Sequence, residues 1–153
     1  MPENKQEYEY YMRSALAEAK MAFADGESPI GAVIVLDGEI IASAHNMRET
    51  KNDATSHAEI TAIRKAGKKL GSWRLENCDI YVTLEPCAMC AGAIIQSRIR
   101  TLCYGAADPK AGAAGSVIDL LGDKIFNHKV EVVSGILETE SAEILKQFFR
   151  RLR

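Results

Sequence analysis

Two short segments of the sequence must lie together in space if the chain is to use the chemistry that they carry. Pro86-Cys87-Ala88-Met89-Cys90 places two cysteines three residues apart, and His57-Ala58-Glu59 places a histidine thirty residues upstream of the first. Two thiolates and one neutral imidazole make three protein ligands, the count of a catalytic zinc site whose fourth position is left for water. Any fold of this chain must therefore bring the two segments to one point.

Both segments are predicted to begin helices, over about residues 57–70 and 86–96, with Pro86 in the first turn of the second. A helix start presents unpaired N–H groups and partial positive charge, which favour thiolate over thiol. Cys87 and Cys90 stand at i and i+3, on one side of their helix. The sequence thus predicts one Zn²⁺ held by His57, Cys87 and Cys90, with Glu59 as the group that moves protons for a polarised water.

Each piece of this site has a simpler interpretation when it is taken alone. Ser56-His57-Ala58-Glu59 fits a capping box, in which the glutamate only caps its own helix. Cys-x-x-Cys is also found in redox pairs and in structural zinc sites with four ligands. A structural site would need Cys78 or Cys103 as a further ligand, and both are expected to be small buried residues instead. Because the pieces occur together, they favour a catalytic metal site.

The rest of the chain predicts a mixed α/β fold. Asp37-Gly38 is a strong hairpin turn between strands at 31–36 and 39–44, and a polar loop follows at 45–56. Further strands are expected at 79–83, 101–104 and 130–134, with helices at 5–25 and 117–121. A last helix carries one apolar face, with Ile144, Leu145, Phe148, Phe149 and Leu152. A hairpin followed by alternating helices and strands implies one mixed sheet with helices on both faces, here in a single domain over residues 1–153.

Composition excludes some classes of function. The chain has 153 residues, a formal net charge of -2 and a pI of about 5.9. These values argue against a protein that coats nucleic acid indiscriminately, but they allow a local basic surface. The polar N-terminus shows no secretory signal and the apolar stretches are too short to span a bilayer, so we expect a cytoplasmic protein. In that compartment four cysteines indicate metal binding or catalysis sooner than disulfides.

The two segments together match H-x-E…P-C-x-x-C, the signature of zinc-dependent nucleoside and base deaminases. Longer runs extend the match over nearly the whole chain, and the sequence resembles the bacterial tRNA-specific adenosine deaminases. One departure is Asp53-Ala54-Thr55-Ser56, where that family often has Asp-Pro-Thr-Ala. The runs that carry the resemblance are Thr83 to Ile99, Tyr104 to Ala106, Asp108 with Lys110, Gly112 to Ser116, Asn127-His128, Gly135 to Leu137 and Phe148 to Arg150.

This resemblance implies a three-layer α/β/α fold of the cytidine-deaminase type with a five-stranded mixed sheet. It implies hydrolytic conversion of the wobble adenosine, A34, of a tRNA anticodon to inosine, with Glu59 protonating N1 and then the departing amine. It also implies a homodimer that binds the anticodon stem-loop near the subunit interface. The residues expected to bind substrate are Asn46, Asp108, Lys110, Asn127 and Phe149.

The C-terminal helix adds a further expectation about RNA. Phe149 could stack on a base while Arg150, Arg151 and Arg153 meet phosphates, although basic residues at a helix end are also explained by the helix dipole. Two rival functions stay open: a deaminase of free guanine or cytosine that uses the same centre, and a non-catalytic RNA-binding module with a structural zinc.

Overall fold

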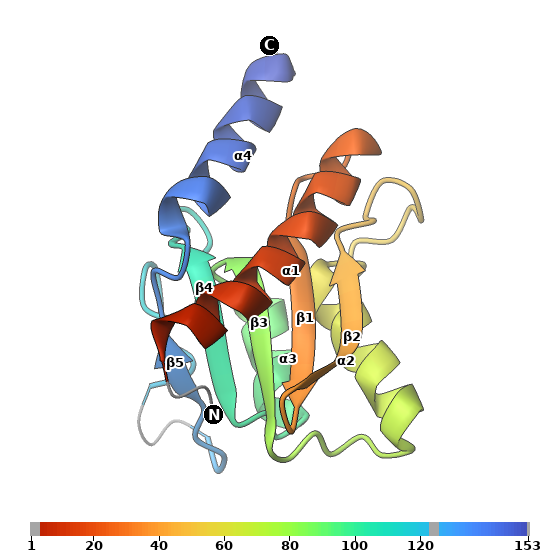
Figure 1. The fold of residues 1–153 in the computed structure, drawn as a ribbon, viewed down its shortest axis with the longest axis vertical. Coiled ribbons are helices and arrows are strands. Elements are labelled where there is room, and N and C mark those ends of the chain that lie inside the picture. The colour runs from red at the N-terminus through yellow and green to blue at the C-terminus, as the bar shows by residue number, and fades with distance from the viewer. Residues whose placement is uncertain (1–3, 123–125, 153) are drawn as a thin grey trace.

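The computed structural model describes residues 4–122 and 126–152. Within these residues one mixed sheet has the strand order β2-β1-β3-β4-β5 (Figure 1). Strand β1 is antiparallel to both β2 and β3, whereas β3, β4 and β5 run parallel. The predicted five-stranded mixed sheet is therefore confirmed. The strands are β1 (Gly31–Leu36), β2 (Glu39–His45), β3 (Cys78–Leu84), β4 (Thr101–Ala106) and β5 (Glu131–Val133).

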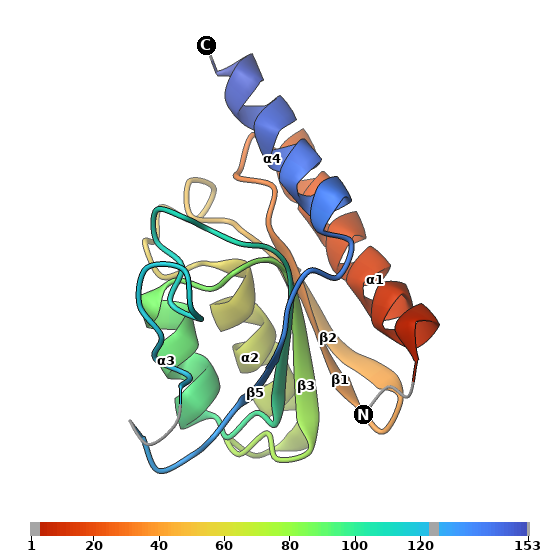
Figure 2. The same cartoon turned by 90° about the vertical axis from the view of Figure 1, so that its left-hand side faces the viewer.

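Helices cover both faces of this sheet (Figure 2). Helices α1 (Lys5–Ala24) and α4 (Glu138–Arg151) lie on one face, and α2 (Ala58–Leu70) and α3 (Ala88–Gln96) lie on the other. This arrangement confirms the predicted three-layer α/β/α architecture. None of these helices, in the part of the chain that the structure describes, is long and apolar enough to cross a membrane.

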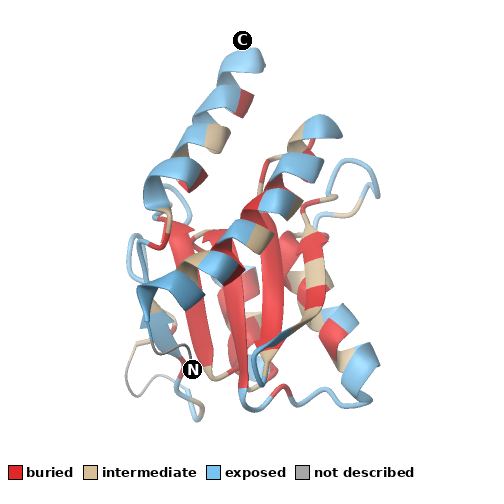
Figure 3. Ribbon diagram, in the orientation of Figure 1, coloured by how far each residue is buried: buried red, intermediate tan, exposed pale blue. Residues whose placement is uncertain are grey.

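The three central strands are buried along almost their whole length (Figure 3). Their two faces belong to two apolar clusters, one under α2 and α3 and one under α1. Helix α1 approaches β1 so closely that a Cβ atom at Gly31 would overlap the carbonyl oxygen of Ala15. Burial on both faces holds the strands rigid, and α3 begins only a few residues after β3 ends.

The predicted helix over residues 117–121 is wrong. A helix needs each N–H to reach the carbonyl four residues earlier, whereas the N–H groups of Val117 and Ile118 both reach the carbonyl of Gly112. The N–H of Ser116 is bound by the side chain of Glu85. Residues 107–122 therefore form an irregular loop, which carries one isolated bridge between Ala114 and Asp119.

Two smaller expectations about helices also need correction. Pro86 lies outside the helix predicted over residues 86–96, because Cys87 is the N-cap of α3 and Ala88 is its first residue. In α4, Phe148 is buried but Phe149 is exposed, as is the C-cap residue Leu152. The apolar pattern of the last helix is thus only partly directed at the core, and Phe149 is left at the surface.

Candidate active site

The predicted ligands meet where α2 and α3 begin, beside the end of β3. His57 is the N-cap of α2, Cys87 is the N-cap of α3, and Cys90 lies in the first turn of α3. The Nδ1 atom of His57 lies 3.7 Å from the Sγ atom of Cys87 and 3.5 Å from that of Cys90. In open α/β sheets this carboxyl edge of the parallel strands is the usual place for a site.

The spacing of these atoms fits a tetrahedral zinc ion. Zn–S bonds of about 2.3 Å and Zn–N bonds of about 2.0–2.1 Å at tetrahedral angles separate the sulfur and nitrogen atoms by about 3.6 Å. The two observed separations, 3.7 and 3.5 Å, lie on either side of this value. His57, Cys87 and Cys90 thus form a preformed donor set that suits zinc in both chemistry and size.

The two cysteines titrate as a pair. The hydrogen bond from the Cys90 thiol, with a further contribution from His57, lowers the pKa of Cys87 to about 3. The same contact with Cys87, together with burial, raises the pKa of Cys90. Cys87 is therefore a ready thiolate, the form that binds a metal ion.

The site has three protein ligands among the described residues. Their candidate metal-binding atoms lie within 4.8 Å of one another, and neither Cys78 nor Cys103 belongs to the group. Cys78 is buried at the start of β3, and Cys103 is buried in β4 against the α1 face. Without a fourth protein ligand, the arrangement matches an open catalytic site and not a closed structural one.

Glu59 is not the partner in a capping box. The N-cap of α2 is His57 and not Ser56, and it makes no side-chain capping bond. The Ser56 hydroxyl instead donates to Asp53 Oδ2 at 3.1 Å. Glu59 is 4% exposed and lines the cavity beside the ligands. Burial raises its pKa to about 7, so this carboxyl group is suited both to accept and to release a proton near neutral pH.

A cavity of about 150 Å³ opens next to the ligand group. It is smaller than the pockets of about 300–1,000 Å³ that hold drug-sized ligands, and it suits one ring system. Among the residues predicted to bind substrate, it brings together Asn46, which is buried, and Asp108. The lining residues are Ser28, Ile30, Asn46, Arg48, His57, Ala58, Glu59, Leu84, Glu85, Cys87, Asp108 and Ala111.

A second hollow of about 330 Å³ adjoins the first, with which it shares Ser28, Ile30, Leu84 and Asp108. The rest of its wall comes from the loop after β4 and from α4, and it includes the predicted Lys110 and Phe149. Phe149 is 51% exposed. This end of the molecule therefore offers an apolar surface next to the smaller cavity.

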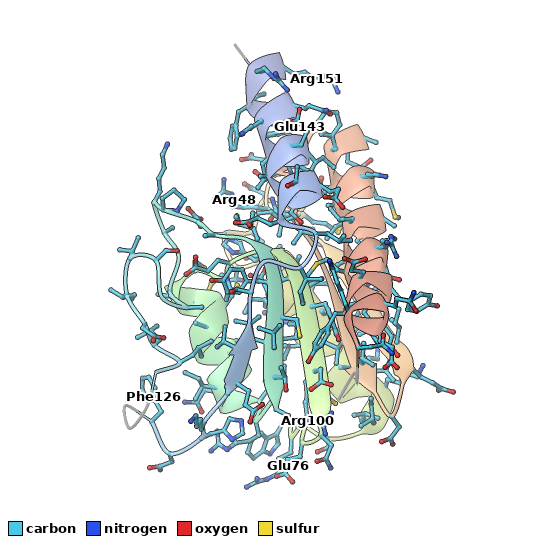
Figure 4. The ribbon with its side chains drawn as sticks, turned by 60° about the vertical axis from the view of Figure 1, so that its left-hand side comes forward. Arg48, Glu76, Arg100, Phe126, Glu143 and Arg151 are labelled. Atoms are coloured by element: carbon cyan, nitrogen blue, oxygen red, sulfur yellow. The ribbon has the colours of Figure 1, made fainter. Side chains whose placement is uncertain are left out.

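Asn127 does not line either hollow. It is exposed, and its neighbour His128 places Nε2 2.7 Å from the carbonyl oxygen of Ile99, just before β4 begins. Figure 4 shows the adjoining Phe126 at the same end of the molecule as Arg100, away from Arg48. The structure thus separates Asn127 from the other substrate-binding candidates of its own chain.

The C-terminal arginines have intramolecular partners. Arg150 pairs with Glu143 at 3.0 Å, and the guanidinium of Arg151 lies 4.9 Å from the ring centroid of Phe23. Both partnerships are at the surface and leave donors for other groups. Arg153 lies outside the described residues.

Sequence reasoning missed three groups around the cavity. Arg48 lines it from the loop after β2, and Glu85 lines it from the end of β3. Glu27, which follows α1, is 1% exposed and binds the loop that carries Arg48. A glutamate within a loop gives no sequence signal that it is buried, because its burial depends on donors that come from distant segments.

A three-layer α/β/α fold with a His/Cys/Cys group at two helix starts defines the class of zinc-type deaminases. Residues 5–153 match the MafB19-like deaminase family model. The chain is 54% identical over 145 residues to the tRNA-specific adenosine deaminase of Bacillus subtilis (strain 168), which covers 95% of this chain and 90% of the relative. It therefore belongs to the MafB19-like deaminase family and, within it, to the tRNA-specific adenosine deaminases.

Two solved structures also show that the chain is more similar to a tRNA deaminase than to a guanine deaminase. One, from biochemical and structural studies of A-to-I editing by tRNA:A34 deaminases, has a TM-score of 0.86 and 51% identity, covering 89% of this chain and 99% of that one. The guanine deaminase of Bacillus subtilis has a TM-score of 0.63 and 36% identity, covering 76% of this chain and 85% of that one. Both measures are higher for the tRNA deaminase.

Proposed function

We propose that this chain deaminates the wobble adenosine, A34, of a tRNA anticodon by hydrolysis, giving inosine and ammonia. The observation that carries the proposal is the convergence of three zinc ligands and a buried Glu59 on one cavity of about 150 Å³. A cavity of this size accepts a single flipped-out base, and the open fourth ligand position leaves room for water. The high identity to tRNA-specific adenosine deaminases supports the choice of substrate.

In this proposal His57, Cys87 and Cys90 hold one zinc ion per subunit. When it is bound, zinc supplies the Lewis acidity that lowers the pKa of a water in the site towards about 7. Glu59 takes one proton from the attacking water and delivers it to adenine N1 as the bond between oxygen and C6 forms. It then moves the remaining hydroxyl proton to the amino group, which leaves as ammonia when the C6–N bond breaks.

The walls of the two hollows provide the contacts to RNA. Asn46 and Asp108 meet the base in the smaller cavity, while Lys110 and Phe149 meet a neighbouring nucleotide in the larger one. Arg150 and Arg151 in the last turn of α4 approach phosphates, and the same role for Arg153 stays a prediction. The role expected for Asn127 stays a prediction, because in its own chain it is remote from both hollows.

The proposal includes three further features. Residues 1–153 act as one deaminase domain, the enzyme is a homodimer with the anticodon stem-loop near its interface, and a tRNA substrate places the reaction in the cytoplasm. A free-base deaminase of guanine or cytosine is the main alternative, and the 36% identity to a guanine deaminase keeps it in view. A free base, however, has no need of the second hollow or of the exposed Phe149.

The test uses the zinc-loaded protein and a synthetic anticodon stem-loop that carries A34. Inosine is measured by mass spectrometry of the digested RNA, and ammonia is measured in parallel with free guanine, cytosine and adenine. We expect inosine at position 34 and no ammonia from the free bases. A stem-loop with A at position 35 and G at position 34 is the matched control. Ammonia from a free base alone would refute the proposed substrate.

A further inference from the structure

Glu85 is a buried carboxylate with an unusual number of partners. It follows β3 directly and is 2% exposed. It accepts the N–H of Asp108 at 3.0 Å, that of Ala114 at 2.9 Å and that of Ser116 at 3.1 Å, together with the Ser116 hydroxyl. Four donors from one loop nearly saturate the two oxygens. Glu85 thus holds both ends of the loop over residues 108–116.

The loop is shaped around this carboxylate. A Cβ atom at Gly112 would overlap the carboxyl group of Glu85, so only glycine lets the backbone pass so close. Within the loop, Asp108 Oδ1 accepts the N–H groups of Lys110 at 3.0 Å and Ala111 at 3.2 Å. Glu85 therefore fixes the backbone of Asp108, and Asp108 fixes the turn that carries Lys110.

Glu27 has the same role on the other loop. It is 1% exposed, and its carboxylate accepts the N–H of Glu49 at 3.1 Å as well as the N–H and the hydroxyl of Thr50. These donors directly follow Arg48, which lines the cavity. Figure 2 shows both loops, after β2 and after β4, at the end of the molecule where α2 and α3 begin.

Both carboxylates act as hydrogen-bond acceptors for their loops. At Glu27, burial alone would raise the pKa, but the hydrogen bonds from Thr50 and Glu49 outweigh burial and lower it. At Glu85 the contacts themselves define the same role, because three N–H groups and one hydroxyl group of the loop donate to its two oxygens.

We propose that Glu27 and Glu85 are positioning residues for substrate binding, each of which fixes one loop of the cavity wall before the RNA arrives. The inference rests on the proposed function, since it assigns these loops to RNA. If the loops were released, they would have to be ordered during binding, and the entropy lost would weaken binding of the RNA. The reacting groups stand on helix starts and would keep their places.

The test compares Glu27→Gln and Glu85→Gln with the wild type. Glutamine keeps the size of the side chain but directs an NH₂ group at backbone N–H donors, so the loop loses acceptors. We expect KM for the A34 stem-loop to rise about tenfold in each variant while kcat changes less than about threefold. Zinc content, measured by metal analysis, should stay at the wild-type level.

Asp79→Asn is the matched control. Asp79 is a buried carboxylate, 3% exposed, at the start of the strand that Glu85 follows, and it binds Arg100 through bonds of 3.0 and 2.9 Å. This variant should lower Tm and leave KM unchanged, because it lies at the other end of β3. If the two glutamine variants also lose only Tm and keep the wild-type KM, Glu27 and Glu85 are structural residues and the inference fails.

Ser116→Ala is a milder variant, and with Glu85→Gln it forms a double-mutant cycle. It removes one hydroxyl donor from Glu85, so KM should rise a few-fold, and adding it to Glu85→Gln should give no further increase, as expected for one shared interaction. A fully additive double variant would contradict a role of Ser116 through Glu85.

Amide hydrogen exchange separates this inference from the proposed function. Residues 108–118 should exchange faster in Glu85→Gln, and residues 48–52 faster in Glu27→Gln, whether or not the protein acts on RNA. Unchanged exchange would overturn the inference. An inactive but zinc-loaded wild type with the expected exchange pattern would instead overturn the proposed substrate.

Discussion

The metal-ligand centre and the two loops around it both depend on buried glutamates, but they use them in opposite ways. Glu59 has a raised pKa because burial outweighs its few donors, whereas Glu27 and Glu85 have lowered pKa values because loop donors surround them. All three are at most 4% exposed. The balance between burial, which dominates at Glu59, and aligned donors, which dominate at Glu27 and Glu85, therefore decides whether a carboxyl group here moves a proton or holds a loop.

The two regions also differ in how they are supported. The ligands stand on helices that begin at the edge of a buried sheet, so packing of the core fixes them. The loop after β4 adds Ala113 and Leu121 to the core, but carboxylate bonds from Glu85 and Glu27 fix the parts of the two loops next to the cavity. We expect changes at the centre to abolish the reaction and changes at the loops to weaken the binding of substrate.

The largest expected effect comes from removing a metal ligand. In Cys90→Ala the donor set falls from three to two, so zinc should be lost and inosine formation should fall to background. Metal analysis and the A34 assay measure both. Cys103→Ala is the control, because Cys103 is equally buried but lies in β4 outside the ligand group. Normal zinc content and activity in Cys90→Ala would show that the ligand set is wrong.

Glu59→Gln should leave the zinc in place and slow the chemical step. Loss of general acid–base catalysis lowers kcat by about 10²–10⁴-fold, while binding of the stem-loop should change little because the side chain keeps its size. Single-turnover kinetics and a binding titration separate the two quantities. A variant with wild-type kcat would remove Glu59 from the mechanism and leave the proton transfer to another group.

The metal-ligand centre was predictable because its residue types and its local structure both indicate a metal site. Ligand spacing in Cys-x-x-Cys and two helix starts are local features, and the structure brings His57 to Cys87 and Cys90 as the sequence suggested. The loop from Asp108 onward was not predictable in the same way. A helical pattern of apolar residues covers Val117, Ile118, Leu120 and Leu121. The N–H groups of this loop nevertheless bind the carbonyl of Gly112 and the carboxylate of Glu85, and not carbonyls four residues earlier.

Long-range contacts explain what the sequence did not reveal. The importance of Glu85 follows from donors 23 to 31 residues further along the chain, which no local pattern reveals. Asn127 was grouped with the substrate-binding residues by resemblance, and its role stays a prediction, because its neighbour His128 binds Ile99 away from the two hollows. The strands and the four helices of the structure follow from periodicity, whereas loop placement depends on individual side-chain bonds.

Gly112→Ala tests the loops at their tightest point. The added methyl group would overlap the carboxylate of Glu85, so the loop must shift, with an expected rise in KM of about tenfold and a small fall in Tm. Gly92→Ala is the control, because a Cβ atom at Gly92 meets nothing within 4 Å in the chain. Alanine also has a higher helix propensity than glycine, so this change should not destabilise α3. If Gly112→Ala binds the stem-loop like the wild type, the close approach has no part in shaping the wall.

The smallest expected effect is on stability and depends on pH. The folded-state pKa of Glu27 lies below its ordinary value of 4.5, so its charge stabilises the fold fully above that value and loses the contribution as pH falls through the folded pKa. At pH 7, Glu27→Gln should reduce the free energy of unfolding by about 1–3 kcal/mol. Because glutamine does not titrate, the difference from wild type should shrink steadily below pH 4.5. Urea unfolding at several pH values measures the difference, and a gap that stays constant down to the acid limit would mean that Glu27 does not hold its loop through its charge.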